Sequence, residues 1–252
     1  MPERVVTDET AAGPGLFGKL PAHGDFVSRG LPHDLVERLH TLLRETMAAG
    51  KRRAGPGWLD AYLTAPIWRF AATGACLGRS AAVGLVMPSV DAVGRHFPAL
   101  LLHRMAGDAG ALTLLDAAHA WLSRAEALAL DALETELTAA AVMSRLAELA
   151  PPMAYGPPAP GGMDDGPPWR VALDPVDAGP DARAYAGLGD CAMRRALGPY
   201  SVWTTAGSDR VPAELCVLAG LPGPACLAGF MAGPAATATP TAAPVPTGGV
   251  AP

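Results

Sequence analysis

Three short apolar runs lie close together in the middle of the chain, and their spacing limits the folds that the chain can adopt. Residues 67–73 and 80–87 are separated by a short segment that begins at Gly74 and includes Gly78, a pattern typical of a hairpin. Residues 99–105 form a third apolar run soon afterwards. Parallel neighbours need a crossover of about a dozen residues or more, usually a helix. These runs are too close together for such crossovers, so a purely parallel sheet is disfavoured.

Helical patterns lie on both sides of this block. Pro32 begins a stretch in which apolar residues recur at helical spacing, and Gly50 ends it. Residues 58–63 are predicted to form one short helical turn, and the Ala- and Leu-rich residues 112–149 to form two helices. The other predicted elements are strands at 15–20, 200–205 and 215–219, a helix at 188–197, and a last helix after Pro224.

The interleaving of strands and helices predicts an α/β fold. We expect a three-layer αβα sandwich whose central sheet is mixed, with only part of its pairing antiparallel. Half of the 252 residues are apolar, so the chain can bury a large core. We place the folded domain at residues 15–232 and expect its Pro- and Gly-rich segment 150–168 to be a flexible loop. Residues 1–14 are predicted to be a disordered leader, and residues 233–252 a disordered Ala/Pro/Thr tail.

Charge and composition argue against several classes of partner. The net charge of −5 disfavours nucleic acid, whose phosphates require a basic face. The N-terminus does not read as a secretory signal, and no apolar run reaches the roughly 18–20 residues needed to span a bilayer. We therefore expect a cytoplasmic protein without membrane insertion. The four cysteines form no Cys-x-x-Cys pair, so we expect reduced thiols and neither a metal nor another cofactor.

Two polar segments, residues 18–29 and 88–98, carry charged and hydroxyl side chains between glycines and prolines. One interpretation is an acid–base cluster built on His23 and Asp25. The alternative is structural: Asp25 caps a turn and pairs with Arg29, and His23 is a loop residue. A serine nucleophile at Ser89 would favour a Gly-x-Ser-x-Gly elbow, which this sequence lacks.

Aromatic residues crowd around Pro66. Such clusters are usually core because the rings bury large areas. An exposed edge at Trp68 and Arg69 would instead suit a docking surface, since Trp and Arg are favoured at protein interfaces. The candidate docking side chains are Trp58, Tyr62, Trp68, Arg69 and Phe97.

Several ordered blocks resemble one known family. They are Gly-Lys-Leu-Pro-x-x-Gly-Asp-Phe at 18–26, Trp-Leu-x-x-Tyr-Leu-Thr-x-Pro-Ile-Trp-Arg-Phe at 58–70, and Pro-Ser-Val-Asp-x-Val-Gly-Arg-x-Phe-Pro at 88–98. In these blocks the chain resembles the TagF (ImpM) family of type VI secretion system-associated proteins. The resemblance is dense over residues 15–105 and looser to about residue 232.

The resemblance implies regulation of protein secretion. Members of the family are cytoplasmic accessory proteins that repress assembly or firing of the secretion machine after translation. It further implies binding to components of that system, with a forkhead-associated scaffold protein as the expected partner. The family fold is a three-layer α/β sandwich, in agreement with the prediction above.

We therefore expect a non-enzymatic regulator in which the two polar segments meet and form one network. Its predicted members are Lys19, His23, Asp25, Arg29, Ser89, Asp91 and Arg95. Two alternatives stay open. One is a hydrolase or transferase that uses His23, Asp25, Ser89 and Asp91, and the other is a structural subunit of the secretion apparatus.

Overall fold

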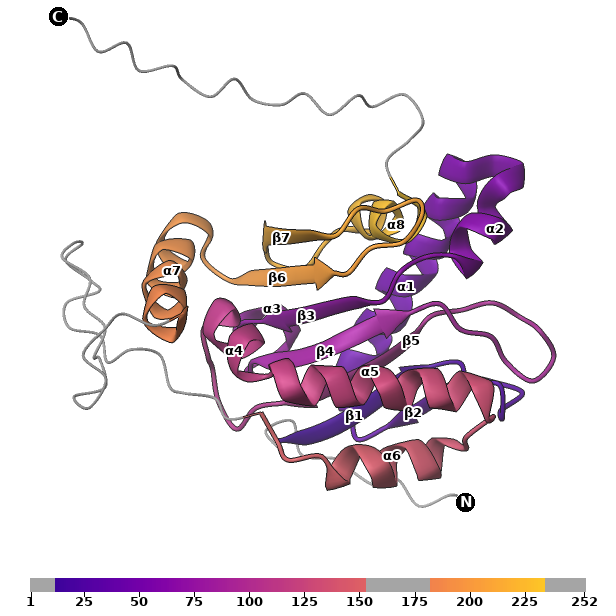
Figure 1. Cartoon of the computed structure of the whole chain (residues 1–252), viewed down its shortest axis with the longest axis horizontal. Helices are drawn as coiled ribbons and strands as arrows, with labels where there is room; N and C mark the ends of the chain where they lie inside the picture. The colour runs from indigo at the N-terminus through magenta and orange to yellow at the C-terminus, as the bar shows by residue number, and fades with distance from the viewer. Residues whose placement is uncertain (1–11, 153–181, 234–252) are drawn as a thin grey trace, which may run out of the picture.

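The computed structural model describes residues 12–152 and 182–233, which contain a seven-stranded sheet (Figure 1). The strand order is β2-β1-β5-β4-β3-β6-β7. The strands are β1 (Gly13–Gly18), β2 (Val27–Arg29), β3 (Trp68–Ala72), β4 (Ala82–Met87), β5 (Ala99–Arg104), β6 (Tyr200–Thr205) and β7 (Glu214–Ala219).

All the strand pairings in the described part of the chain are antiparallel. The expectation of a mixed sheet is therefore corrected, whereas antiparallel pairing of the three central runs is observed as β3, β4 and β5. Gly74 and Gly78 do not form a tight turn. A short helix, α3 (Gly74–Leu77), occupies the connection between β3 and β4.

The remaining helices lie between strands in the sequence, except the last, which follows β7. They are α1 (His33–Ala54), the 3₁₀ helix η1 (Gly55–Gly57), α2 (Trp58–Leu63), α4 (Ala111–Ala117), α5 (His119–Glu134), α6 (Ala139–Glu148), α7 (Ala182–Leu197) and α8 (Pro224–Ala232). The segment 112–149, predicted as two helices, contains three. The first break falls at Ala118, and the second ends at Thr138, whose hydroxyl accepts a hydrogen bond from the Ala141 N–H and caps α6.

Two apolar clusters lie against opposite faces of the sheet. Residues alternate between the faces along each strand. In β3, Ala71 belongs to the cluster that includes α4, α5 and α6, while Phe70 and Ala72 belong to the cluster that includes α1, α2 and α8. Figure 1 shows α5 and α6 in front of the sheet and α1 behind it.

The C-terminal helix α8 completes the second cluster. The Trp68 ring stacks on the Phe230 ring with centroids 4.0 Å apart, and the Trp68 indole N–H donates to the Phe230 carbonyl at 2.8 Å. Trp203 of β6 stacks on Phe70 of β3 at 4.8 Å. The late elements β6 and α8 are thus packed into the same core as the early ones.

A buried carboxylate holds α7 against the start of α4. The side chain of Asp190 accepts hydrogen bonds from the backbone N–H groups of Leu112 and Thr113 at 2.8 and 3.1 Å, and from the hydroxyls of Thr113 and Tyr200. Gly110 permits this approach, because a Cβ there would overlap the Asp190 carboxylate. Burial, together with the nearby carboxylate, raises the pKa of Tyr200 above its usual value.

Much of the predicted domain organisation concerns residues outside the described part of the chain. The loop predicted at 150–168 is described only as far as residue 152, and the predicted tail only at Gly233. The predicted leader ends too late, because Gly13 and Pro14 already belong to β1 and pair with β5. Within the described residues, no helix is both long and apolar enough to cross a membrane.

Candidate functional site

The two polar segments leave the sheet at the same place. β1 ends at Gly18 and β4 ends at Met87, and both of these residues pair with Ala99 at the start of β5. The loop that follows β1 and the loop that joins β4 to β5 therefore start side by side. Antiparallel pairing around β5 brings together two segments that are about 70 residues apart in the chain.

We call the contact between these two loops the junction. Asp91 is at its centre, and the Asp91 side chain is fully buried. One carboxylate oxygen accepts hydrogen bonds from the Lys19 ammonium at 2.8 Å and the Arg95 Nε at 2.7 Å. The other oxygen accepts from the backbone N–H groups of Val93 and Arg95 at 3.1 and 2.9 Å. Both oxygens are therefore satisfied, and two cations flank one anion.

These contacts set the ionisation of Asp91. Burial alone would raise the pKa of this carboxyl, but the hydrogen bonds from Lys19, Arg95 and Val93 outweigh it. The net result is a pKa well below the usual range for aspartate. Asp91 is therefore charged at neutral pH although it is buried.

Ser89 joins the same loops through uncharged contacts. Its hydroxyl donates to the Lys19 carbonyl at 2.7 Å. The Tyr62 hydroxyl of α2 accepts from the Ser89 N–H and donates to the Ser89 carbonyl, both at 2.9 Å. Burial raises the pKa of Tyr62 above its usual value. The junction is thereby fixed to α2 as well as to β1.

His23 belongs to the junction through its backbone and reaches a different helix with its side chain. The His23 carbonyl accepts a hydrogen bond from the Ala92 N–H at 2.9 Å, and the Gly24 carbonyl accepts one from the Arg95 guanidinium. The His23 Nε2 accepts from the Ala139 N–H at 2.8 Å, at the first residue of α6. His23 therefore helps to cap α6, as an imidazole nitrogen satisfies one of its free N–H groups.

Two predicted members of the network lie outside it. The Asp25 carboxylate accepts from the neighbouring Phe26 N–H at 2.8 Å, and the Arg29 guanidinium donates to the Ser28 carbonyl at 2.8 Å. The described contacts do not join Asp25 to Arg29, so the predicted ion pair is corrected. Arg29 lies in β2 opposite Leu16, whereas Asp25 precedes that strand in the exposed loop.

The candidate docking aromatics are buried. Trp58, Tyr62, Trp68 and Phe97 all belong to the cluster behind the sheet. The predicted exposed edge at Trp68 is therefore corrected. Arg69 points to the opposite face of the sheet from Trp68, because successive residues of a strand alternate, and it is half-buried there beside Glu126.

The exposed aromatic residue of this region is Phe26, which the sequence analysis did not single out. Its ring lies 5.0 Å from the Lys19 ammonium and packs edge-on against Phe97, with centroids 4.8 Å apart. It nevertheless remains 42% exposed, and the nearby loop exposes Val93 at 70% and the Arg95 side chain at 58%. We call Phe26, Val93 and Arg95 the loop surface. A Phe directly after the charged Asp25 in a Gly-containing loop was the available sequence signal.

The arrangement does not assemble a serine–histidine pair. The Ser89 hydroxyl donates to a backbone carbonyl, and the His23 Nε2 accepts from the α6 backbone. Asp25 lies in the exposed part of the loop, away from these contacts. A nucleophile requires a base within hydrogen-bond reach, and the described contacts use both groups to fix the backbone.

Comparisons with known proteins agree with this architecture. A seven-stranded antiparallel sheet with helices defines the class, an α/β protein that carries a polar loop junction at one end of its sheet. The TagF N-terminal domain family, described as type VI secretion system-associated, matches residues 15–149. The chain therefore belongs to this family, as its motifs indicated, and has an accessory role in type VI secretion.

A solved structure extends the likeness beyond that segment. The chain is similar to PA0076 from Pseudomonas aeruginosa PAO1, whose crystal structure was determined at 2.05 Å resolution. The two are 33% identical, and the alignment covers 92% of this chain and 100% of that one with a TM-score of 0.72. None of the curated proteins compared with the chain matches it.

Proposed function

We propose that this protein is a cytoplasmic, non-enzymatic negative regulator of type VI secretion that acts after translation by binding components of the machine. The loop surface formed by Phe26, Val93 and Arg95 is its proposed docking site. A forkhead-associated scaffold is the proposed partner, as the family resemblance implies. We interpret the fold of the present protein, which carries this surface, as a three-layer αβα sandwich, because apolar clusters lie on both faces of its sheet.

The observation that carries the proposal is the rigid support beneath an exposed apolar and cationic surface. Arg95 is anchored at both Asp91 and Gly24, yet more than half of its side chain is exposed. Phe26 is held by the Phe97 ring and lies over Lys19. Pre-organised aromatic and arginine side chains lose little conformational freedom on binding, which favours their use as interface anchors.

The engagement of the polar groups favours this proposal over a hydrolase. Ser89, Asp91 and Lys19 are used to join two loops, which is how a fixed surface is built. A structural subunit of the apparatus would need a permanent interface, and such interfaces are larger and more apolar than this surface. A transient regulator fits its small size better.

Binding measurements with purified proteins test the proposal. We expect Phe26→Ala and Arg95→Gln to weaken binding to the forkhead-associated scaffold of the same secretion system by about tenfold or more, the size of a typical interface hot spot. Arg210→Gln is the matched control, because Arg210 forms an exposed ion pair with Asp60 and makes no hydrogen bond with the two loops in the described part of the chain. Calorimetric titration measures the affinities.

Secretion assays in cells separate regulation from assembly. Deletion of the gene should raise effector export, and the Phe26→Ala and Arg95→Gln variants should fail to restore repression. Unchanged or lower export after deletion contradicts a negative regulator. Normal binding by both variants contradicts the loop surface as the docking site. A turnover activity abolished by Asp91→Ala would favour the enzyme instead.

A further inference from the structure

Along one row of side chains on the face that α5 and α6 cover, burial by these two helices ends at a charged residue. The backbone register aligns a row of side chains across six strands on this face. From β1, β5, β4, β3, β6 and β7 in turn, they are Leu16, Leu101, Leu85, Arg69, Thr204 and Leu215. The first three are fully buried in the cluster with α5 and α6. Leu215, at the other end of the row, is 58% exposed. Arg69 and Thr204 lie at the transition.

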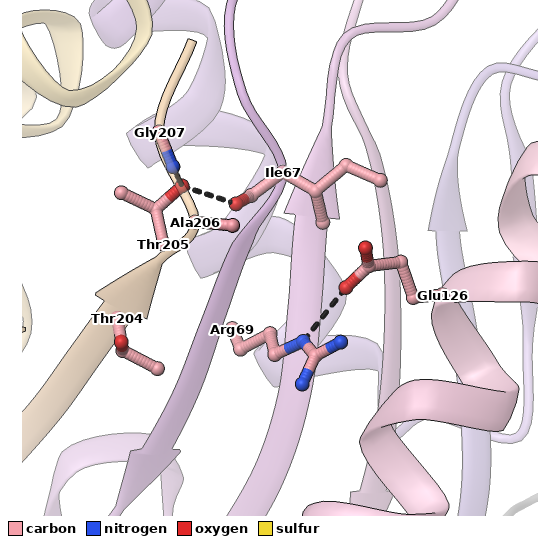
Figure 2. A pocket seen from close by; sticks show the side chains of 7 residues that line it. All are labelled: Ile67, Arg69, Glu126, Thr204, Thr205, Ala206 and Gly207. Carbon is pink, nitrogen blue, oxygen red and sulfur yellow. Dashed lines mark hydrogen bonds and ion pairs between the residues drawn. The ribbon is translucent and has the colours of Figure 1, made fainter. Parts of the chain in front are cut away.

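A cavity of about 430 Å³ occupies this transition. Its walls are Ile67 and Arg69 of the β3 region, Glu126 of α5, and the end of β6 from Thr204 to Gly207 (Figure 2). Small-molecule sites in proteins usually measure about 300–1,000 Å³. This cavity is therefore large enough for a small metabolite and is independent of the loop surface.

Arg69 and Glu126 point toward one another across the cavity, as Figure 2 shows. The Arg69 Nε donates to one Glu126 oxygen at 2.7 Å, and both side chains remain about one-quarter exposed. Within residues 12–152 and 182–233, the two terminal amino groups of Arg69 and the second Glu126 oxygen have no hydrogen-bond partner. The fork of donors and the carboxylate oxygen are thus both available to a ligand.

The two threonines of the cavity wall differ in whether their hydroxyls have hydrogen-bond partners among the described residues. The Thr205 hydroxyl donates to the Ile67 carbonyl at 2.8 Å and accepts from the Gly207 N–H at 3.1 Å, so it fixes the wall itself. The Thr204 hydroxyl makes no hydrogen bond with the described residues, and Thr204 pairs directly with Arg69 in the sheet. A hydroxyl and a guanidinium on neighbouring strands can bind one carboxylate together.

We propose that this cavity binds a small zwitterion of the α-amino acid class. Its carboxylate is held by the terminal amino groups of Arg69 and the Thr204 hydroxyl, and its ammonium by the free oxygen of Glu126. The charge of the site selects this class: the ion pair is neutral, so a simple anion is repelled by Glu126 and a simple cation by Arg69. The bidentate geometry of arginine suits a carboxylate.

Ligand titrations of the purified full chain test the site. Each proteinogenic amino acid is added singly at millimolar concentration, and thermal unfolding and calorimetry report binding. We expect at least one amino acid to raise the Tm saturably and to bind with one-to-one stoichiometry. Succinate and ethylamine, which carry only one sign of charge, should not bind comparably.

Variants locate the site. Arg69→Gln and Glu126→Gln should each weaken binding by about tenfold or more, because each removes a charged hydrogen-bonding group. Arg145→Gln is the matched control. Arg145 of α6 forms an ion pair with Asp131, which lies on α5 as Glu126 does, and neither Arg145 nor Asp131 lines this cavity. If either variant fails to fold, Thr204→Val, which changes a single hydroxyl, supplies the comparison.

Three results would overturn the proposal. In the first, no amino acid raises the Tm or produces calorimetric heat. In the second, succinate binds as tightly as the best amino acid, which makes this an anion site. In the third, binding survives unchanged in the folded Arg69 and Glu126 variants. None of these results bears on the loop surface.

Discussion

Two buried aspartates stabilise this protein in different ways. Asp91 accepts hydrogen bonds from two cations and two backbone N–H groups. Asp190 accepts from two backbone N–H groups and two hydroxyls, and among the described residues no cation donates a hydrogen bond to it. Both arrangements provide a buried carboxylate with hydrogen-bond donors, but the donors that they leave at the protein surface differ.

This difference indicates which of the two sites can contribute to partner recognition as well as to stability. At Asp190 every donor is itself part of the packed junction between α4, α7 and β6, so nothing is left for a partner. At Asp91 one of the two cations, Arg95, extends to the surface. A junction neutralised by an exposed cation can support the fold and still contribute to recognition.

The largest expected effect comes from removing the carboxylate that has only neutral donors. Asp190→Ala leaves two N–H groups and two hydroxyls without their acceptor at a buried helix end. We expect a loss of roughly 3 kcal/mol in the free energy of unfolding, since each unsatisfied buried group costs about 1–3 kcal/mol. Urea denaturation measures the loss. A loss below about 1 kcal/mol, within the range of a single ordinary hydrogen bond, would contradict the structural role of Asp190.

The next effect depends on pH and belongs to Asp91. Its folded pKa lies below the value of 3.8 expected for the unfolded chain. Its contribution to stability is therefore fully present above pH 3.8 and is lost as the pH falls toward the folded pKa. Asp91→Asn should be less stable than the wild type at neutral pH, and the gap should narrow in acid.

Denaturation curves of both proteins across this pH range measure that gap. A gap that stays constant below pH 3.8 would mean that the charge of Asp91 is not what the junction uses. The corresponding Asp190→Ala series provides the comparison between the two carboxylates at each pH.

The smallest expected effect is that of the exposed cation. Arg95→Gln leaves Asp91 with Lys19 and the two backbone N–H groups. Because the Arg95 side chain is more exposed than buried, solvent screens its pairing. We expect a change of about 1 kcal/mol or less. A loss as large as that of Asp190→Ala would remove the distinction between the two junctions.

Most of the longer helices and strands were predicted from the sequence because the spacing of apolar residues reflects which side chains are buried, whereas the short elements β2 and α3 were not predicted. Apolar runs at 67–73, 80–87, 99–105 and 200–205 predicted the strands that the structure places at 68–72, 82–87, 99–104 and 200–205. Helical spacing predicted the helix that the structure places at His33–Ala54. The number of helices in 112–149 was wrong because Ala and Leu favour helix throughout, and the breaks depend on tertiary contacts and on the Thr138 cap.

The candidate site was predictable only in part. Constrained backbone and opposite charges indicated that Lys19, Asp91 and Arg95 belong together, and antiparallel pairing explains why they meet. The fates of Asp25 and Phe26 depend on how a loop turns, which local sequence does not determine. Asp190 gave no signal, because its donors carry no charge and three of the four come from Leu112 and Thr113, 77–78 residues away.

The match to the family ends at residue 149, but the physical unit does not. Cutting the chain there would remove β6, β7 and α8, exposing one edge of β3 and uncovering the indole of Trp68. Residues 15–149 contain the part of the sequence that matches the family, and β6, β7 and α8 complete the sheet and the core on which this part packs. Any minimal version of the protein must therefore retain both halves.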